Sequence, residues 1–152
     1  MRQLEQLLNQ AKKLAKEYRA LTGKPLGITG EVAEFYAAKY IKGFLKLEPA
    51  RTPGYDAKQK EGNKTVLVQI KGRCIPNDAK PGQRIGSIKL NKDWDRLVLV
   101  LMDEDFEITK IIKAERHDVE RELKAPGSKA RNERGALSIS KFIRIGDTLW
   151  PR

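Results

Sequence analysis

The sequence has little cysteine, little histidine and no long apolar segment, and each shortage excludes a class of protein. The only cysteine is Cys74, so the chain forms no intramolecular disulfide and no cysteine-based metal site. The only histidine is His117, which excludes a histidine-rich metal site and weakens any assignment as a serine protease. The longest apolar run, residues 97–102, is far too short to span a membrane, so no membrane partner is expected.

The first residues, MRQLEQ, lack the apolar region of a signal peptide. We therefore expect an intracellular, cytoplasmic protein. The chain of 152 residues is long enough to bury a core, and its 39% hydrophobic and 34% charged residues are typical of a globular protein. We find no internal repeat and no linker, so the sequence predicts a single domain over residues 1–152.

Positive charge is the main compositional bias of the chain. It has 31 Lys and Arg against 20 Asp and Glu, for a net charge of +11. The excess is uneven, because residues 51–89 hold nine basic residues and three acidic ones. Such a bias favours a polyanion partner, with nucleic acid ahead of an anionic membrane, and a generally basic surface is the alternative. Charge alone does not distinguish DNA from RNA.

Hydrophobic periodicity and turn residues divide the chain into helices and strands. The predicted helices span residues 3–21, 29–42 and 114–124, and the predicted strands span residues 44–47, 54–60, 65–71, 97–101 and 106–113. Thr29 is the expected N-cap of the second helix. Residues 74–87 and 125–135 are rich in Pro, Gly or Lys and are expected to be loops, and residues 137–145 fit either a strand or a helical turn. The order of elements predicts an α/β fold with a mixed β-sheet flanked by helices.

One constellation of polar residues lies on the predicted hairpin. Gly62-Asn63 is a tight-turn signal, and a two-residue loop there places Asp56 opposite Gln69. Opposed residues share a face of the sheet, and Lys71 joins Gln69 on that face because side chains alternate along a strand. A bulge would shift this register by one residue.

An acid, an amide and an amine on one face are suited to holding a divalent metal beside a phosphodiester. Mg²⁺ prefers one or two carboxylates together with water and phosphate oxygens. We expect Asp56 to be the direct ligand, with the main-chain carbonyl of Ile70, the amide oxygen of Gln69 and the carboxylate of Glu31 as further ligands. Glu34 competes with Glu31 for the helix position, and its alternative role is a surface ion pair. Lys71 is expected to orient or deprotonate the attacking water.

These residues resemble the signature of the PD-(D/E)XK nuclease superfamily. The resemblance covers residues 29–101 and rests on Gly54-Tyr55-Asp56, on Val68-Gln69-Ile70-Lys71 and on a helix that opens with residues 30–34. It implies a restriction-endonuclease-like core of the αβββαβ type, here with an extra N-terminal helix. It also implies that Asp56 is the metal carboxylate, that Lys71 is the motif lysine and that Glu31 is the helix glutamate. Gln69 stands where the family usually has Asp or Glu.

The sequence therefore predicts a Mg²⁺-dependent endonuclease acting on duplex or branched DNA, with Mn²⁺ as a possible substitute. We expect it to be associated with the nucleoid and to form a homodimer or higher oligomer, because a duplex has two strands to cut. The expected nucleic-acid contacts are Arg73, Lys58, Arg84, Lys129 and Arg131. Two alternatives stay open: a non-catalytic nucleic-acid-binding module of the same fold, and an RNA-binding or RNA-processing protein.

Overall fold

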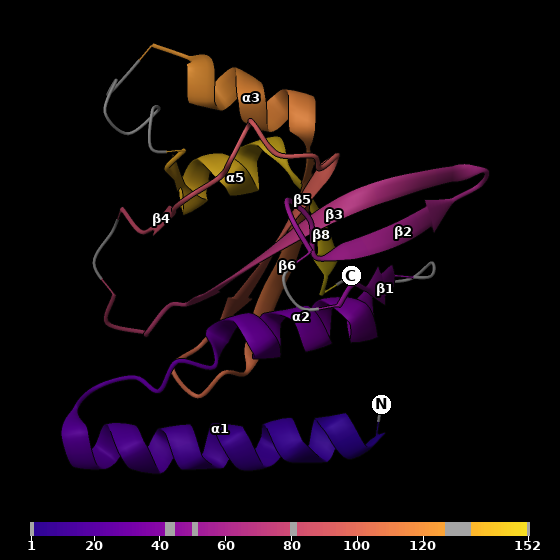
Figure 1. Ribbon diagram of the computed structural model, residues 1–152. Coiled ribbons are helices and arrows are strands. Elements are labelled where there is room, and N and C mark those ends of the chain that lie inside the picture. The colour runs from indigo at the N-terminus through magenta and orange to yellow at the C-terminus, as the bar shows by residue number, and fades with distance from the viewer. Residues whose placement is uncertain (1, 42–44, 50–51, 80–81, 127–134, 152) are drawn as a thin grey trace.

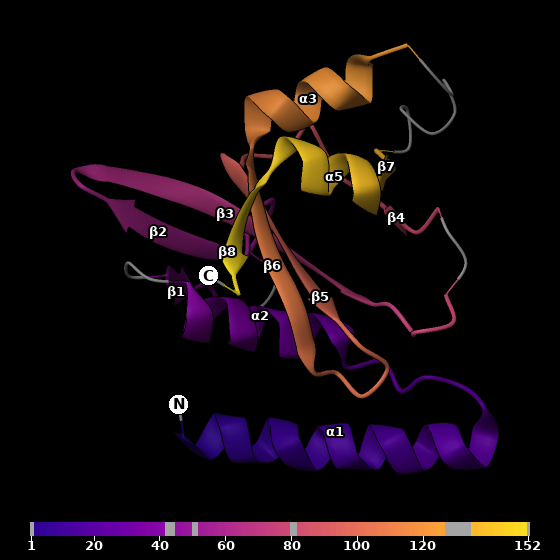
Figure 2. The same cartoon turned by 180° about the vertical axis from the view of Figure 1, so that it is seen from behind.

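The protein is a mixed β-sheet with helices on both faces, as a computed structural model shows (Figure 1). The structure describes residues 2–41, 45–49, 52–79, 82–126 and 135–151. Four helices lie within these ranges: α1 Arg2–Thr22, α2 Thr29–Tyr40, α3 Arg116–Lys124 and α5 Ile139–Ile145. Seen from behind, α2 covers one face of the sheet, α3 and α5 cover the other, and α1 lies outside α2 (Figure 2).

The main sheet has six strands in the order β1-β2-β3-β5-β6-β8. Their bounds are β1 Leu45–Leu47, β2 Ala57–Glu61, β3 Lys64–Cys74, β5 Arg96–Met102, β6 Ile108–Glu115 and β8 Asp147–Trp150. The pair β3–β5 is parallel and every other pair is antiparallel. A separate two-stranded sheet joins β4 Arg84–Ile85 to β7 Leu137–Ser138.

The central strand β5 is buried along its whole length because both of its faces are covered. Val98 and Val100 belong to the apolar cluster that includes α2, whereas Leu97, Leu99 and Leu101 belong to the cluster that includes α3 and α5. The uninterrupted apolar sequence of this strand therefore supplies two cores at once.

The sequence-based prediction of an α/β fold with a mixed sheet flanked by helices is confirmed. The predicted αβββαβ order is wrong in one respect. Residues 75–95 connect β3 to the parallel strand β5 through β4, with no helix among the described residues of this segment. Two prolines and two glycines in residues 74–87 disfavour a helix there.

Three further details differ from the expectations. Ile28 is the N-cap of α2, and Thr29 lies inside the helix with its hydroxyl 4.0 Å from the sulfur of Cys74. The ambiguous segment 137–145 is the short strand β7 followed by α5. The edge strand β8 was not predicted, because four residues with two at intermediate burial carry little periodic signal. Among the described residues, no helix is both long and apolar enough to cross a membrane.

Close packing of α2 on β3 depends on Gly72. A Cβ atom at this position would lie 2.6 Å from the Cβ of Ala33 and 3.1 Å from the carbonyl oxygen of Thr29. Both neighbours are rigid, one being backbone and the other a side chain without rotatable bonds. Only glycine therefore allows the helix to approach the strand at this point.

We predict that Gly72→Ala destabilises the protein by about 1–3 kcal/mol, because the helix must move away from the sheet. Denaturant unfolding followed by circular dichroism measures the change. The matched control is Gly27→Ala, where an added Cβ meets nothing within 4 Å and the backbone needs no positive φ. Equal stability of the two variants would contradict the packing role of Gly72.

Candidate metal and catalytic site

The site begins where β2 ends and β3 continues alone. β2 pairs with β3 only as far as Ala57 and Val68, whereas β3 runs on to Cys74. Beyond that point the backbone of β3 has no strand on this side, so its polar groups need other partners. Oδ2 of Asp56 supplies one of them, because it accepts a hydrogen bond from the Ile70 N–H at 2.7 Å.

The predicted hairpin register is correct from Glu61 back to Ala57, with the loop at Gly62-Asn63. It breaks at Asp56, whose N–H donates to the oxygen of Val68 at 2.8 Å although Val68 is already the partner of Ala57. The carbonyl of Asp56 turns the other way and accepts from the Glu48 N–H at 2.8 Å. Asp56 therefore lies in a bulge-like irregularity, which directs its side chain differently from that of a regular strand residue.

Gly54 fixes the chain that leads into this irregularity. It has a φ of +84°, and a Cβ there would lie 2.9 Å from the carbonyl oxygen of Asp93. The glycine therefore serves both a left-handed conformation and a close backbone contact with the segment before β5.

Glu34 on α2 is the carboxylate whose electrostatics are coupled to Asp56. Its side chain is half-buried, and burial raises its pKa, with the negative charges of Asp56 and then Glu31 raising it further. Glu31, the expected helix ligand, lies on the exposed first turn of α2. Glu34 is thus the helix carboxylate that shares the half-buried environment of Asp56.

Gln69 carries the most unusual polar atom of the site. Its Oε1 is buried and has no hydrogen-bond partner, the only such side-chain atom among the described residues. Buried acceptors are nearly always paired, and leaving one unpaired costs free energy. The amide oxygen of Gln69, one residue before the Ile70 N–H that Asp56 binds, is therefore without a partner inside the described part of the protein.

Lys71 follows Gln69 on the same face of β3, as the alternation of the strand predicts. Burial lowers its pKa, the positive charges of Arg73 and Lys89 lower it further, and Asp56 acts in the opposite direction. Its ammonium group lies 3.4 Å from the carbonyl oxygen of Ser87, in the segment after β4. A lysine in such an environment releases its proton more readily than a surface lysine does.

The residues predicted to contact nucleic acid divide into three groups. Arg73 donates to the carbonyl oxygens of Gly72 at 2.7 Å and of Arg84 at 3.2 Å, so it braces β3 against β4. Arg84 is half-buried in β4, and Lys58 is exposed on β2 with its ammonium 3.5 Å from Glu48. Lys129 and Arg131 lie outside the described residues.

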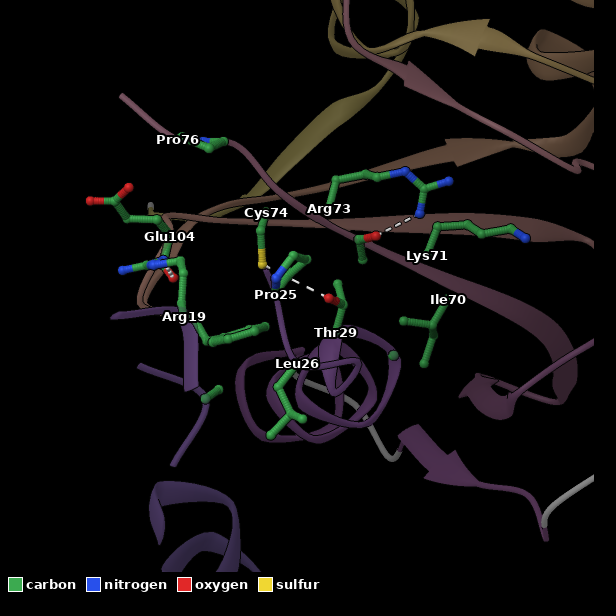
Figure 3. A pocket seen from close by; sticks show the side chains of 14 residues that line it. Arg19, Pro25, Leu26, Thr29, Ile70, Lys71, Arg73, Cys74, Pro76 and Glu104 are labelled. Carbon is green, nitrogen blue, oxygen red and sulfur yellow. Dashed lines mark hydrogen bonds between the residues drawn. The ribbon is translucent and has the colours of Figure 1, made fainter. Parts of the chain in front are cut away.

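A pocket of about 610 Å³ lies beside the unpaired half of β3 (Figure 3). Its walls come from the end of α1, the start of α2 and residues 70–74 of β3. Leu26 and Ile70 are at its floor in the close-up view, and Thr29 points toward Cys74 across it. Ile70 and Lys71 are the candidate-site residues that line this pocket, whereas Asp56, Glu34 and Gln69 are not part of its lining.

The oxygen atoms of the candidate site are of the kind that bind a hard divalent cation such as Mg²⁺. The described residues contain no group of three or more His, Cys, Asp or Glu side chains that could hold a metal. Mg²⁺ does not need such a group, since one or two carboxylates with water and substrate oxygens suffice. Asp56 and Glu34, which interact electrostatically, supply two such carboxylates, and Gln69 supplies an amide oxygen on the other face of β3. The Ile70 carbonyl faces the same side as its N–H, toward Asp56.

Sequence reasoning weighed Glu31 above Glu34, and the structure explains why the choice was difficult. Both glutamates lie near the start of α2, but Glu31 is exposed whereas Glu34 is half-buried, which depends on the depth at which the helix packs on the sheet. That depth is set by the contact of Gly72 with Ala33, which pairs residues far apart in the sequence. The one available signal was Val32-Ala33, an apolar pair that turns the first helical turn toward the sheet and leaves Glu31 outside.

We predict that Glu34→Gln raises the melting temperature by a few degrees at neutral pH. A raised carboxyl pKa means that folding favours the protonated form, so the charged group costs stability above its folded pKa and nothing below its ordinary value near 4. The gain must therefore vanish as the pH falls below about 4. Thermal unfolding across pH measures it, with exposed Glu31→Gln as the control expected to gain less. An equal gain for Glu31→Gln would contradict the assignment.

The comparisons with known proteins leave this site to be judged on its geometry. A scan of protein-family models finds none that matches the chain, and a search of curated proteins finds no match either. The fold class is α/β with a mixed six-stranded sheet.

Proposed function

We propose that the protein is a metal-dependent endodeoxyribonuclease that hydrolyses phosphodiester bonds of duplex or branched DNA. The observation that carries the proposal is the buried, unpaired Oε1 of Gln69 on the strand that Asp56 contacts. A structural role for this oxygen would normally come with a hydrogen bond from a donor within the protein.

In this proposal Asp56, Gln69, the Ile70 carbonyl and a helix glutamate hold Mg²⁺ or Mn²⁺. When bound, the metal supplies charge neutralisation at the phosphate and a more acidic water. Glu34 is the better supported helix glutamate, because burial raises its pKa and the charge of Asp56 raises that pKa further. A cation between two carboxylates removes the repulsion that raises that pKa.

Lys71 is the proposed proton-transfer and charge-stabilising residue. Its pKa is lowered by burial and by neighbouring positive charges, which favours the exchange of a proton with the attacking water. Its position two residues after Gln69 puts it on the face of β3 that carries the amide. The bond to the Ser87 carbonyl holds its ammonium group on that face.

Exposed lysines on the same face of the sheet support DNA as the substrate. Lys46 and Lys58 are cross-strand partners and Lys60 follows on β2, so all three share a face. The alternation in β2 and β3 places this face on the side of Lys71. Lys89 is exposed and close enough to lower the pKa of Lys71. Such a lysine group is suited to phosphate contacts.

The arrangement of strands supports a restriction-endonuclease-like core. Helix α2 is followed by three consecutive antiparallel strands, β1 to β3, and then by the parallel strand β5. This order contains the αβββ part that the sequence resemblance implies. Arg73 acts in this proposal by fixing β3 to β4, and Lys58 acts as a phosphate contact.

The proposal predicts nicking of supercoiled plasmid and of branched DNA in Mg²⁺ or Mn²⁺. Asp56→Ala abolishes it, and Lys71→Ala lowers the rate by about 10²–10⁴-fold because proton transfer is lost. Lys16→Ala, an exposed change on α1, is the matched control and keeps the wild-type rate. Nicking by both site variants at the wild-type rate would refute the assignment.

A matched pair of variants tests the helix ligand. Glu34→Gln is expected to lower the nicking rate by at least tenfold and to weaken Mn²⁺ binding in calorimetry, because a metal-binding carboxylate becomes a neutral amide. Glu31→Gln, three residues away on the same helix, is expected to keep most of the nicking rate and most of the Mn²⁺ affinity. Larger losses for Glu31→Gln than for Glu34→Gln would instead identify Glu31 as the metal ligand on the helix.

A second candidate is a nucleic-acid-binding module without catalysis. The neutral Gln69 favours it, as does the lack of a three-member acidic group among the described residues. Calorimetry with Mn²⁺ separates the two candidates. Salt-sensitive DNA binding without any heat of Mn²⁺ binding would favour the binding module.

A further inference from the structure

Helix α1 uses only one of its faces to contact the rest of the protein. Ala15 is 3% exposed and Lys12 is 8% exposed. The Lys12 ammonium donates to the Tyr36 hydroxyl at 2.5 Å and to Glu107 at 3.2 Å. Arg19 bonds Asp105 at 3.1 Å. Together with the ion pair between Glu5 and Lys39 and the packing of Leu8, these contacts fix α1 on the domain.

A second, apolar stripe runs along the same helix and stays exposed. The exposed fractions are 45% for Leu4, 56% for Leu7, 58% for Leu14, 40% for Tyr18 and 88% for Leu21. These are five of the six large hydrophobic side chains that are exposed among the described residues. Concentration of such side chains on one helix indicates an interaction surface.

The spacing of the stripe identifies the shape of its partner. With Ala11 included, its positions are 4, 7, 11, 14, 18 and 21, so steps of three and four residues alternate over the whole helix. This is the heptad pattern of a coiled-coil seam, in which each side chain fits between side chains of a facing helix. The 21 residues of α1 give a seam about 30 Å long.

We propose that α1 pairs antiparallel with α1 of a second copy of this chain, about a two-fold axis between residues 12 and 13. This register opposes Leu4 to Leu21, Leu7 to Tyr18 and Ala11 to Leu14, so every layer of the seam is apolar. A parallel pair would set Ala11 against Ala11 and leave a gap in the middle of the seam. The antiparallel pair also opposes the two helix dipoles.

The residues beside the seam fit a helix partner better than a membrane. Gln3, Gln10 and Glu17 flank it on the side away from the domain. A helix that lies on a membrane surface carries Lys and Arg in such positions, whereas these residues are neutral or acidic. In the antiparallel register Gln10 of each copy lies beside Glu17 of the other, so no two cations meet at that point. The proposal does not depend on metal, DNA or the candidate site.

Analytical ultracentrifugation of the full chain, without metal or DNA, tests the proposal. The wild type is expected at twice the 17.3 kDa chain mass, and Leu7→Glu/Leu14→Glu at the mass of one chain. The matched control is Asn9→Glu/Ala20→Glu, which adds the same charges to exposed positions on the polar side of α1 and keeps the dimer. A monomeric wild type, or a dimer that survives the stripe substitutions, would overturn the proposal.

Cysteine cross-linking tests the orientation with single substitutions in a Cys74→Ala background. Mixing Leu4→Cys protein with Leu21→Cys protein is expected to give a disulfide-linked dimer on oxidation, and each protein alone is expected to give little. Cross-linking within the Leu4→Cys protein alone would contradict the antiparallel register. This test needs no charge in the seam, so it holds even where the double glutamate variant folds poorly. Binding to anionic vesicles by a monomeric wild type would assign the stripe to a membrane and reject the dimer.

Discussion

The candidate site depends on a single structural mismatch, in which β3 is longer than the strand beside it. β2 stops at Ala57, and the remaining half of β3 has no strand partner on that side. A backbone donor there must be satisfied by other means, and the Asp56 carboxylate satisfies that of Ile70. The same opening leaves room for the pocket that borders residues 70–74. The unpaired N–H of Ile70 requires an acceptor, and the irregular backbone at Asp56 places a carboxylate where it can accept that hydrogen bond.

The surroundings of this part of β3 shift the pKa values of one acidic and one basic side chain in opposite directions. Burial and the neighbouring carboxylates raise the pKa of Glu34, and burial with neighbouring cations lowers that of Lys71. In both cases the charged form is disfavoured, and groups with shifted pKa values are often found at functional sites. A cation near the carboxylates would stabilise the charged form of Glu34, and a phosphate near the lysines would stabilise the charged form of Lys71. The two shifts are therefore complementary to a metal bound together with a polyanion.

Much of the fold could be predicted from local patterns, whereas the site could be predicted only in part. The long amphipathic α1, the apolar β5 and the turn at Gly62-Asn63 each have a periodic or turn signal, and each agrees with the structure. The register of the hairpin follows from that turn and is correct up to Ala57. What no local pattern contains is the bulge at Asp56 and the depth of α2 on the sheet. Both arise from contacts between distant residues, and they decide which glutamate of α2 approaches Asp56.

A neutral residue at position 69 adds no charge to a region where the carboxylates of Asp56 and Glu34 already repel each other. An acid in place of Gln69 would add a further negative charge to the part of β3 that Asp56 contacts, and the charge of Asp56 already contributes to the raised pKa of Glu34. The amide keeps an oxygen in the same place without that charge, and its Oε1 remains unpaired. In the proposed nuclease, a neutral amide at this position contributes less to cation binding than a carboxylate would. The affinity for metal is therefore the quantity that separates the proposed nuclease from the proposed binding module.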